Sequence, residues 1–247
     1  MKIKLDVKKN VFQNAAHYFD DAKVAKQKAE SLIKARKDLL AKAALASKPA
    51  APRQQARVVE VRKREWFEKY HYFTTSGGRL CIAGRDAKQN ESIYSRYMEE
   101  NDLFLHADIQ GAPFTLLKDG VNASPQELAE AAQLAASYSS AWKRGYGVVD
   151  VYSARKEQLS KTSQGEYVAK GGFVVKGRRE WHRNVELRLA VGLARSGPAV
   201  VPALSPLPLE GRVELLPGGE KTVVAKKLAL KLSIDAASAE RLLQLLP

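Results

Sequence analysis

His106 and Asp108 are the residues whose types and spacing most resemble a catalytic pair. They stand one residue apart in FLHADIQGAPF, residues 104–114, which reads as the end of a buried strand followed by a turn. On a strand both side chains would share a face, where the carboxylate could orient the imidazole as a general base or hold a structural histidine in place. No nucleophile with an obvious base, phosphate-binding loop or carboxylate pair accompanies them. We therefore expect no enzymatic activity, no cofactor and no bound metal, with Gly111 and Pro113 serving as turn residues.

The stretch KGRREWHRN, residues 176–184, interleaves basic and aromatic residues. Its charges, which suit phosphate oxygens, are Lys176, Arg178, Arg179 and Arg183. Trp181 and His182 add planar surfaces on which an unpaired base could stack, and Gly177 allows a turn. Single strands and loops of RNA require this combination. The alternative is that Trp181 anchors the core and that the basic residues form an exposed loop around it.

The stretch AGRDAKQNE, residues 83–91, offers a second set of polar contacts. Arg85 carries a planar fork that can hold a phosphate at two points, and Asn90 can hydrogen-bond a base edge or a ribose. Alternatively, Arg85 pairs with Asp86 or Asp108 inside the fold. The other residues that we expect at an RNA-binding surface are Arg62, Lys63, Arg64, Lys88, His106, Arg155, Lys156 and Lys161.

The net charge of +14 is unevenly distributed along the chain. Residues 1–64 carry 17 Lys and Arg against 6 Asp and Glu, residues 65–142 carry 6 against 11, and residues 143–195 carry 12 against 5. Two basic segments that flank an acidic one favour a polyanion bound by particular faces. Anionic lipid is the competing partner, but the basic segments lack the large apolar face of a membrane-surface helix. A merely solubilising basic surface is the third interpretation.

Cysteine content and hydropathy indicate a reducing, cytoplasmic compartment. The single cysteine, Cys81, excludes an internal disulfide framework, and no Cys and His residues have the spacing of a zinc site. The charged N-terminal stretch MKIKLDVKKN is not followed by the apolar run of a signal peptide. No apolar stretch reaches the ~18 residues that a membrane span needs. We expect a soluble protein without a membrane partner.

The chain reads as a helical arm followed by a main domain. Apolar residues recur at helical spacing from Asn14 to Ala46, which predicts one long N-terminal helix of coiled-coil type. Prolines at positions 49 and 52 then end the helix. We assign residues 1–57 to a basic arm and linker, with the arm as a possible protein contact, and residues 58–247 to the main domain.

Strand and helix patterns mingle in the main domain without strict alternation. Gly77 and Gly78 predict a two-residue hairpin turn in which both glycines take positive φ. Asp86 should cap a short helix, and Ser124 with Glu127 forms a capping box for one helix that continues to Gly145. Strands are expected at 102–107, 114–118, 147–154, 165–177, 186–194 and 211–216, and a last helix at 235–246. We predict an α+β fold with a mixed, mainly antiparallel sheet and flanking helices.

Four separated stretches resemble one known family. They are KREWFEKYHYF, AGRDAKQNE, DLFLHADIQGAP and LSKTSQGEYVAKGGFVVKGRREW, and they begin at residues 63, 83, 102 and 159. They are similar to the C-terminal RNA-binding domain, NFACT-R, of the NFACT family of ribosome quality-control factors, typified by RqcH and NEMF. Their order and spacing match an archaeal or eukaryotic version. The family pattern has a second histidine where this chain has Gln110, which further weakens a metal-site interpretation.

The resemblance implies a non-enzymatic RNA-binding module that associates with the ribosome. Its expected partners are the large subunit, with ribosomal RNA or a tRNA bound there, in quality control or in a related role such as hibernation. Full family members begin with a catalytic-looking domain, a helix-hairpin-helix domain and a coiled coil. This chain resembles only the part from the first helix of the coiled coil onward, so it is either a short member or an excised fragment, and tRNA-dependent tailing is not transferred to it. The alternatives are an RNA-processing or RNA-modifying enzyme using His106 and Asp108, and a protein that only docks other proteins through its N-terminal helix.

Overall fold

The computed structural model describes residues 65–163 and 166–247, and six residues of the N-terminal arm. These six, all helical and exposed, are Tyr18, Ala22, Lys26, Ala29, Glu30 and Ile33. The rest of the predicted arm and linker, with Arg62, Lys63 and Arg64, lies outside the described residues. The chain divides into two units, Met1–Gln55 and Ala56–Pro247, and the second contains every element discussed below.

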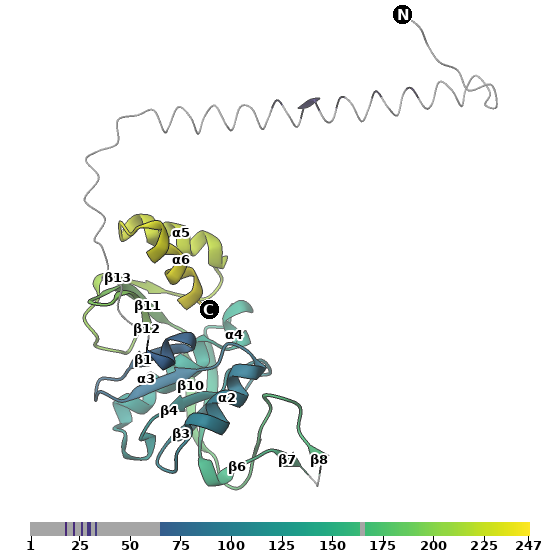
Figure 1. The fold of residues 1–247 in the computed structure, drawn as a ribbon, viewed down its shortest axis with the longest axis vertical. Coiled ribbons are helices and arrows are strands. Elements are labelled where there is room, and N and C mark those ends of the chain that lie inside the picture. Colours follow the sequence, from purple (N-terminus) through teal and green to yellow (C-terminus); the bar gives the residue numbers. More distant parts are fainter. Residues whose placement is uncertain are drawn as a thin grey trace, which may run out of the picture. The chain divides into compact units, whose positions relative to one another are not determined.

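Helices and short strands alternate irregularly along the second unit (Figure 1). The helices are η1 (Trp66–Lys69), α2 (Ala87–Tyr97), η2 (Gly120–Asn122), α3 (Pro125–Ser137), α4 (Ser140–Lys143), η3 (Lys156–Gln158), α5 (Lys221–Lys231) and α6 (Ala236–Leu245). The strands are β1 (His71–Thr74), β2 (Leu80–Ala83), β3 (Leu103–Ala107), β4 (Thr115–Leu117), β5 (Val148–Arg155), β6 (Leu159–Ser160), β7 (Thr162–Ser163), β8 (Glu166–Tyr167), β9 (Val174–Val175), β10 (Glu180–Glu186), β11 (Leu189–Ala194), β12 (Gly197–Pro202) and β13 (Glu210–Leu215).

The centre of the unit is a six-stranded sheet in the order β1-β2-β4-β3-β5-β10. Every strand pair of the described residues is antiparallel, so the prediction of a mixed sheet is wrong in that detail, although the α+β class is confirmed. Short connections join β1 to β2 and β3 to β4, which antiparallel pairing permits, whereas β5 and β10 reach their places only after longer segments of chain. The sheet therefore has two faces, each with its own set of covering elements.

The hairpin between β1 and β2 is correct in place but not in detail. Five residues separate the strands, and Gly78 alone of the two glycines has a positive φ, of 86°. Gly77 has a different role, because a Cβ built there would lie 2.3 Å from Oε1 of Glu127. A glycine at position 77 thus lets the turn approach a buried carboxylate.

Helix α3 covers one face of the sheet with small apolar side chains. Its capping box is formed as predicted, since Ser124 accepts from the Glu127 backbone and Glu127 accepts from the Ser124 backbone. The predicted single helix to Gly145 is wrong, because α3 ends at Ser137 and Ser139 caps a separate α4. Serine at an N-cap offers its hydroxyl to the new helix, which favours a fresh start over continuation.

The opposite face is covered by α2 and by the loop that contains Phe173. Asp86 caps α2 by accepting from the Gln89 backbone at 2.8 Å, as predicted. Phe173 lies 4.8 Å from Phe114 between ring centroids, in a cluster with Phe104. Gly171 holds the loop against α2, where a Cβ would be 2.7 Å from the Ala87 Cα atom.

Residues 187–247 add a three-stranded sheet, β12-β11-β13, and the pair α5 and α6, which Figure 1 shows beside it. The last helix occurs where the sequence predicts it, whereas β12 and α5 do not appear among the predicted elements.

The stretch predicted as a basic loop is also different, because residues 180–186 form the edge strand β10. None of the helices in the described ranges is both long and apolar enough to span a bilayer.

Candidate nucleic-acid interface

Three flat side chains from three adjacent strands form a row on the α2 face of the sheet. His106 of β3 is paired in register with Tyr152 of β5, which is paired with Trp181 of β10. The ring centroids are 5.7 Å apart for His106 and Tyr152, and 5.5 Å apart for Tyr152 and Trp181. Residues directly opposite on antiparallel strands share a face, so strand register alone produces this arrangement. We call His106, Tyr152 and Trp181 the aromatic row.

The aromatic row is buried at its middle and open at its edges. Tyr152 is 8% exposed and packs edge-on against Phe104 of the core, at 6.2 Å between centroids. His106 and Trp181 are both partly exposed. Trp181 lies on the edge strand, so a further planar group could reach one side of the row.

Two arginines lie over the aromatic row. The guanidinium carbon of Arg179 is 4.6 Å from the Tyr152 ring centroid, and that of Arg183 is 4.1 Å from the Trp181 centroid. Arg183 also donates to Asp150 at 2.5 Å, while Arg179 has no ion pair among the described residues. Each such stacked contact stabilises by about 0.5–1 kcal/mol at an exposed site. Stacking leaves the edge of the Arg179 guanidinium able to donate to an anion, whereas Arg183 already donates to Asp150.

His106 has a tyrosine hydroxyl beside its ring nitrogen. Its Nδ1 lies 3.4 Å from the Tyr152 hydroxyl, whereas Asp108 is exposed beyond the end of β3. Burial lowers the pKa of His106, an effect that neighbouring backbone groups and the charge of Asp108 only partly oppose. The ring is therefore largely neutral near pH 7. The His106–Asp108 pair inferred from the sequence is replaced by a His106–Tyr152 pair.

The turn after β3 is held against α4 through its backbone. Gly111 has a φ of 85°, and a Cβ there would come within 3.2 Å of Ser140 Cβ. The Ser140 hydroxyl donates to the Gln110 carbonyl at 2.5 Å. This contact joins the turn to α4, which fits the predicted role of Gly111 as a turn residue.

Four more of the predicted RNA contacts, like His106 and Arg183, have partners within the fold. Asn90 accepts from the Phe114 backbone at 3.1 Å, and Lys156 donates to the Met98 carbonyl at 2.8 Å. Lys161 pairs with Glu91 and donates to the Gly172 carbonyl at 3.0 Å. His182, on the face opposite the row, lies 3.2 Å from the Ser153 hydroxyl. These side chains hold elements together, and an additional role toward RNA stays a prediction.

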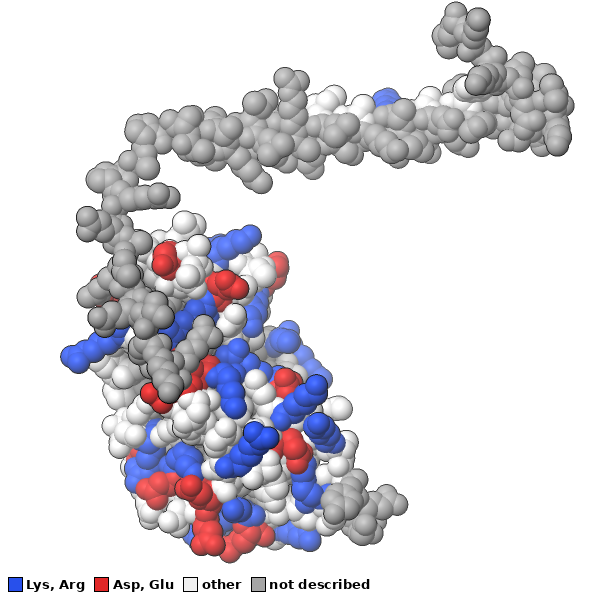
Figure 2. All heavy atoms as spheres, in the orientation of Figure 1, with Lys and Arg blue, Asp and Glu red and all other residues white. Residues whose placement is uncertain are grey.

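The remaining described candidates are exposed or partly exposed basic residues, of which only Arg179 has a contact with the row described above: Arg85, Lys88, Arg155, Lys176, Arg178 and Arg179. Arg85 donates to the Tyr70 carbonyl at 3.2 Å rather than pairing with Asp86 or Asp108. Gln158 donates to the carbonyls of Lys176 and Arg178, at 3.3 and 2.6 Å, and so fixes the turn at Gly177. Figure 2 shows Lys and Arg side chains over the middle of the visible face and acidic ones gathered at its lower edge.

Tyr152 is the member of the row that sequence reasoning missed. It stands in the run VVDVYSAR, where the alternation of side chains places it on the face opposite Val151. That alternation was available from the sequence, but the pairing of β5 with both β3 and β10 was not.

Within the described ranges, no group of three or more His, Cys, Asp or Glu residues could hold a metal ion.

Comparison with known proteins identifies the domain that carries most of this surface. Residues 69–177 match the family described as "NFACT protein RNA binding domain". These residues form an RNA-binding domain of the NFACT family. The archaeal Rqc2 homolog aRqcH of Methanocaldococcus jannaschii is 46% identical over 134 residues, which cover 53% of this chain and 20% of that protein. The confirmed domain is therefore the NFACT-R domain of RqcH-type proteins.

Eukaryotic relatives of the NFACT-R domain extend the similarity. The ribosome quality control complex subunit NEMF homolog of Drosophila melanogaster is 34% identical over 196 residues, covering 77% of this chain and 20% of the relative. Human NEMF is 32% identical over 175 residues, which cover 69% of this chain and 16% of that protein. The chain thus spans about a fifth or less of these relatives. The family match ends at residue 177, so Arg179, Trp181 and Arg183 lie just beyond it.

Proposed function

We propose that the chain is a non-enzymatic RNA-binding module that associates with the ribosome, at the large subunit or at a tRNA held there. The observation that carries this proposal is the aromatic row with its two stacked arginines, directly adjoining and partly within an NFACT-R domain. The relatives are named as ribosome quality control proteins, which supports quality control as the setting, with hibernation as a related role.

The row suits unstacked RNA bases better than a regular duplex. A-form duplexes keep their bases inside the stack, whereas loops and single strands offer free faces to aromatic and guanidinium planes. Trp181 and the arginines can supply such planes, and the basic turn at residues 176–179 can contact the phosphates on either side. Specificity would then come from RNA shape and from exposed bases.

Co-sedimentation with purified ribosomal subunits tests the proposal. We expect the protein to pellet with large subunits at ~50 mM salt and to be released by about 200 mM, because several neutralised phosphates make affinity fall steeply with salt. Free tRNA, added as competitor, separates tRNA recognition from ribosomal RNA recognition. Absence of binding to subunits, tRNA and structured RNA at the lowest salt would refute the proposal.

The non-enzymatic part of the proposal is tested separately. Its support is that His106 is paired with Tyr152 and that Asp108 is exposed beyond the strand end. We expect total RNA to stay intact and unmodified after incubation with the protein, with or without divalent metal. Turnover that His106→Ala abolishes, while RNA affinity is kept, would instead establish the enzyme alternative.

A further inference from the structure

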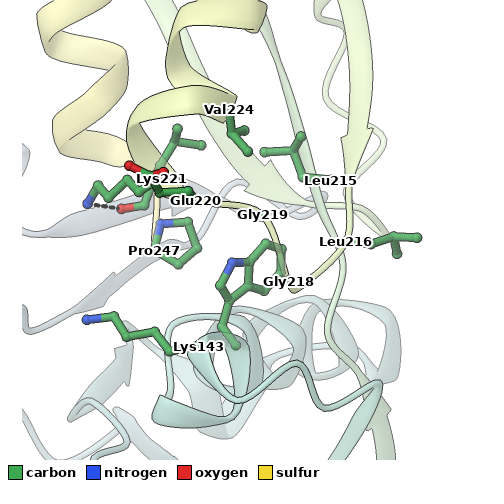
Figure 3. Close-up of a pocket in the computed structure, with 11 residues that line it drawn as sticks. Lys143, Leu215, Leu216, Gly218, Gly219, Glu220, Lys221, Val224 and Pro247 are labelled. Atoms are coloured by element: carbon green, nitrogen blue, oxygen red, sulfur yellow. Dashed lines mark hydrogen bonds between the residues drawn. The ribbon is translucent and has the colours of Figure 1, made fainter. Parts of the chain in front are cut away.

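A pocket of about 420 Å³ lies outside the aromatic row, where α4, the turn before α5 and the end of α6 meet (Figure 3). Its apolar walls are Trp142, Leu215, Leu216, Val224, Leu246 and Pro247. The walls come from segments more than seventy residues apart in sequence, and most of them lie beyond the family match. A pocket of this volume has room for one large apolar side chain with its neighbouring backbone.

The pocket is built from firmly packed parts. Gly219 lies against α5 so closely that a Cβ there would be 2.7 Å from Val224 Cγ2. Lys221 donates to the Leu246 carbonyl at 2.8 Å, a bond drawn in Figure 3 that ties the start of α5 to the end of α6. Leu216 at the rim is 68% exposed. The pocket therefore combines a fixed frame with an uncovered apolar rim.

The charges at the pocket are mainly positive. Lys143 and Lys221 both line it, and neither has an ion pair among the described residues. Glu220 also lines it, and its carboxylate accepts from the Thr222 hydroxyl at 2.5 Å. Burial lowers the pKa of Lys221, and the positive charges of Arg85 and Lys143 lower it further. A carboxylate placed between the two lysines would relieve this repulsion.

We propose that this pocket docks a partner protein through a short segment in which a large apolar side chain stands beside an acidic residue. The aliphatic walls fit a Leu, Ile or Phe side chain, and Lys143 with Lys221 complements the carboxylate. A nucleobase fits less well, because Trp142 is only 8% exposed and offers little ring face for stacking. The pocket is thus a protein-docking site, separate from the RNA-binding row.

A peptide array tests this inference with the full chain. The probes are twelve-residue peptides with a central Leu or Phe flanked by Asp and Glu, by Asn and Gln, or by Lys and Arg. We expect binding to the acidic set alone. Leu216→Ala should weaken it about tenfold, through lost apolar contact, and Lys143→Glu by about fivefold or more, through charge reversal.

Matched controls keep the test specific. Leu230→Ala removes an α5 leucine that is 81% exposed and does not line the pocket, and Lys227→Glu reverses an exposed charge on the same helix. Both should leave peptide binding unchanged. Equal binding of all three peptide sets, or equal loss in the control variants, would overturn the inference. So would a Leu216→Ala protein that binds the peptides normally but has lost RNA affinity, since the pocket would then belong to RNA recognition.

Discussion

The hairpin end of the central sheet and the aromatic row both contain arginines, but Arg79 at the hairpin and Arg179 at the row have different surroundings. Arg79 at the hairpin pairs with Glu127 at 2.9 Å and with Asp119 at 3.2 Å. Arg179 at the row rests on a tyrosine ring and has no ion pair among the described residues. An arginine between carboxylates has its charge satisfied inside the fold, whereas one on a ring keeps charge for an external anion. Net charge alone does not distinguish these two uses.

The hairpin region shows what a stabilising network looks like in this protein. Glu127 is 2% exposed and also accepts from the Thr75 hydroxyl at 2.7 Å and from the Ser124 backbone at 2.9 Å. Burial alone would raise the pKa of Glu127, but the hydrogen bonds from Ser124, Thr75 and Arg79 outweigh it and hold the pKa at about 2. A carboxylate held this way belongs to the folding of the domain.

The largest expected effect is that of Glu127→Ala. Removing the carboxylate leaves the Arg79 charge and several donors without their partner and deletes the capping box, so unfolding free energy should fall by about 3–5 kcal/mol. Chemical denaturation measures this change. RNA affinity of the remaining folded protein should stay the same. A stable variant, or one that folds but no longer binds RNA, would show that the two regions are not separate.

Trp181→Ala should reduce RNA affinity more than it reduces stability, which is the reverse of the effect expected for Glu127→Ala. Trp181 is partly exposed, so we expect a loss of about 1–3 kcal/mol in RNA affinity from lost stacking, with a smaller change in stability than Glu127→Ala gives. Affinity measured at several salt concentrations should keep its slope, because no phosphate contact is removed. A sharp drop in melting temperature would instead make Trp181 a core anchor, and an unchanged affinity would exclude stacking.

The sequence was sufficient for features that depend on local chemistry. The caps at Asp86 and Ser124, the hairpin at 71–83 and the last helix follow from neighbouring residues alone, and all are present. The aromatic row could not be predicted, because it depends on β5 pairing with β3 on one side and β10 on the other. Those strands are separated by α3, α4 and a long loop, and nothing local fixes their register. The requirement for a glycine at position 77 could not be predicted either, because it arises from contact with Glu127, fifty residues away.

Replacing Arg178 and Arg179 by alanine should weaken RNA binding through charge. Each lost phosphate contact should flatten the plot of log affinity against log salt by about 0.7 for single-stranded RNA. The matched control is Lys226→Ala with Lys227→Ala, which removes the same charge from exposed positions of α5. The control should change affinity little at ~150 mM salt, because charges beyond the contact surface are screened. Equal effects of the two double variants would favour a diffuse basic surface over a defined site.

The smallest expected effect is a loss of stability in mild acid, and it again contrasts a histidine of the core with one of the row. Burial lowers the pKa of His71, His106 and His182, and for His71 the charges of Arg85 and Lys221 lower it further. In the unfolded chain these imidazoles regain a pKa near ~6.5, so the unfolded state binds more protons below that pH. The contribution of these histidines to stability should therefore be fully present above about pH 6.5. It should decline as the pH falls toward their lower pKa values in the folded state. His71 stacks on Tyr138 at 4.0 Å between ring centroids, and its Nδ1 is buried without a hydrogen-bond partner in the described part of the chain. His71→Phe therefore keeps the ring contact and removes the titrating nitrogen. Between ~pH 6.5 and 5 the His71→Phe variant should lose less stability than the parent protein, as measured by urea denaturation at each pH. His106→Gln should alter the pH dependence of stability less than His71→Phe does. Identical pH dependence in the His71→Phe variant and the parent would mean that the acid sensitivity arises elsewhere.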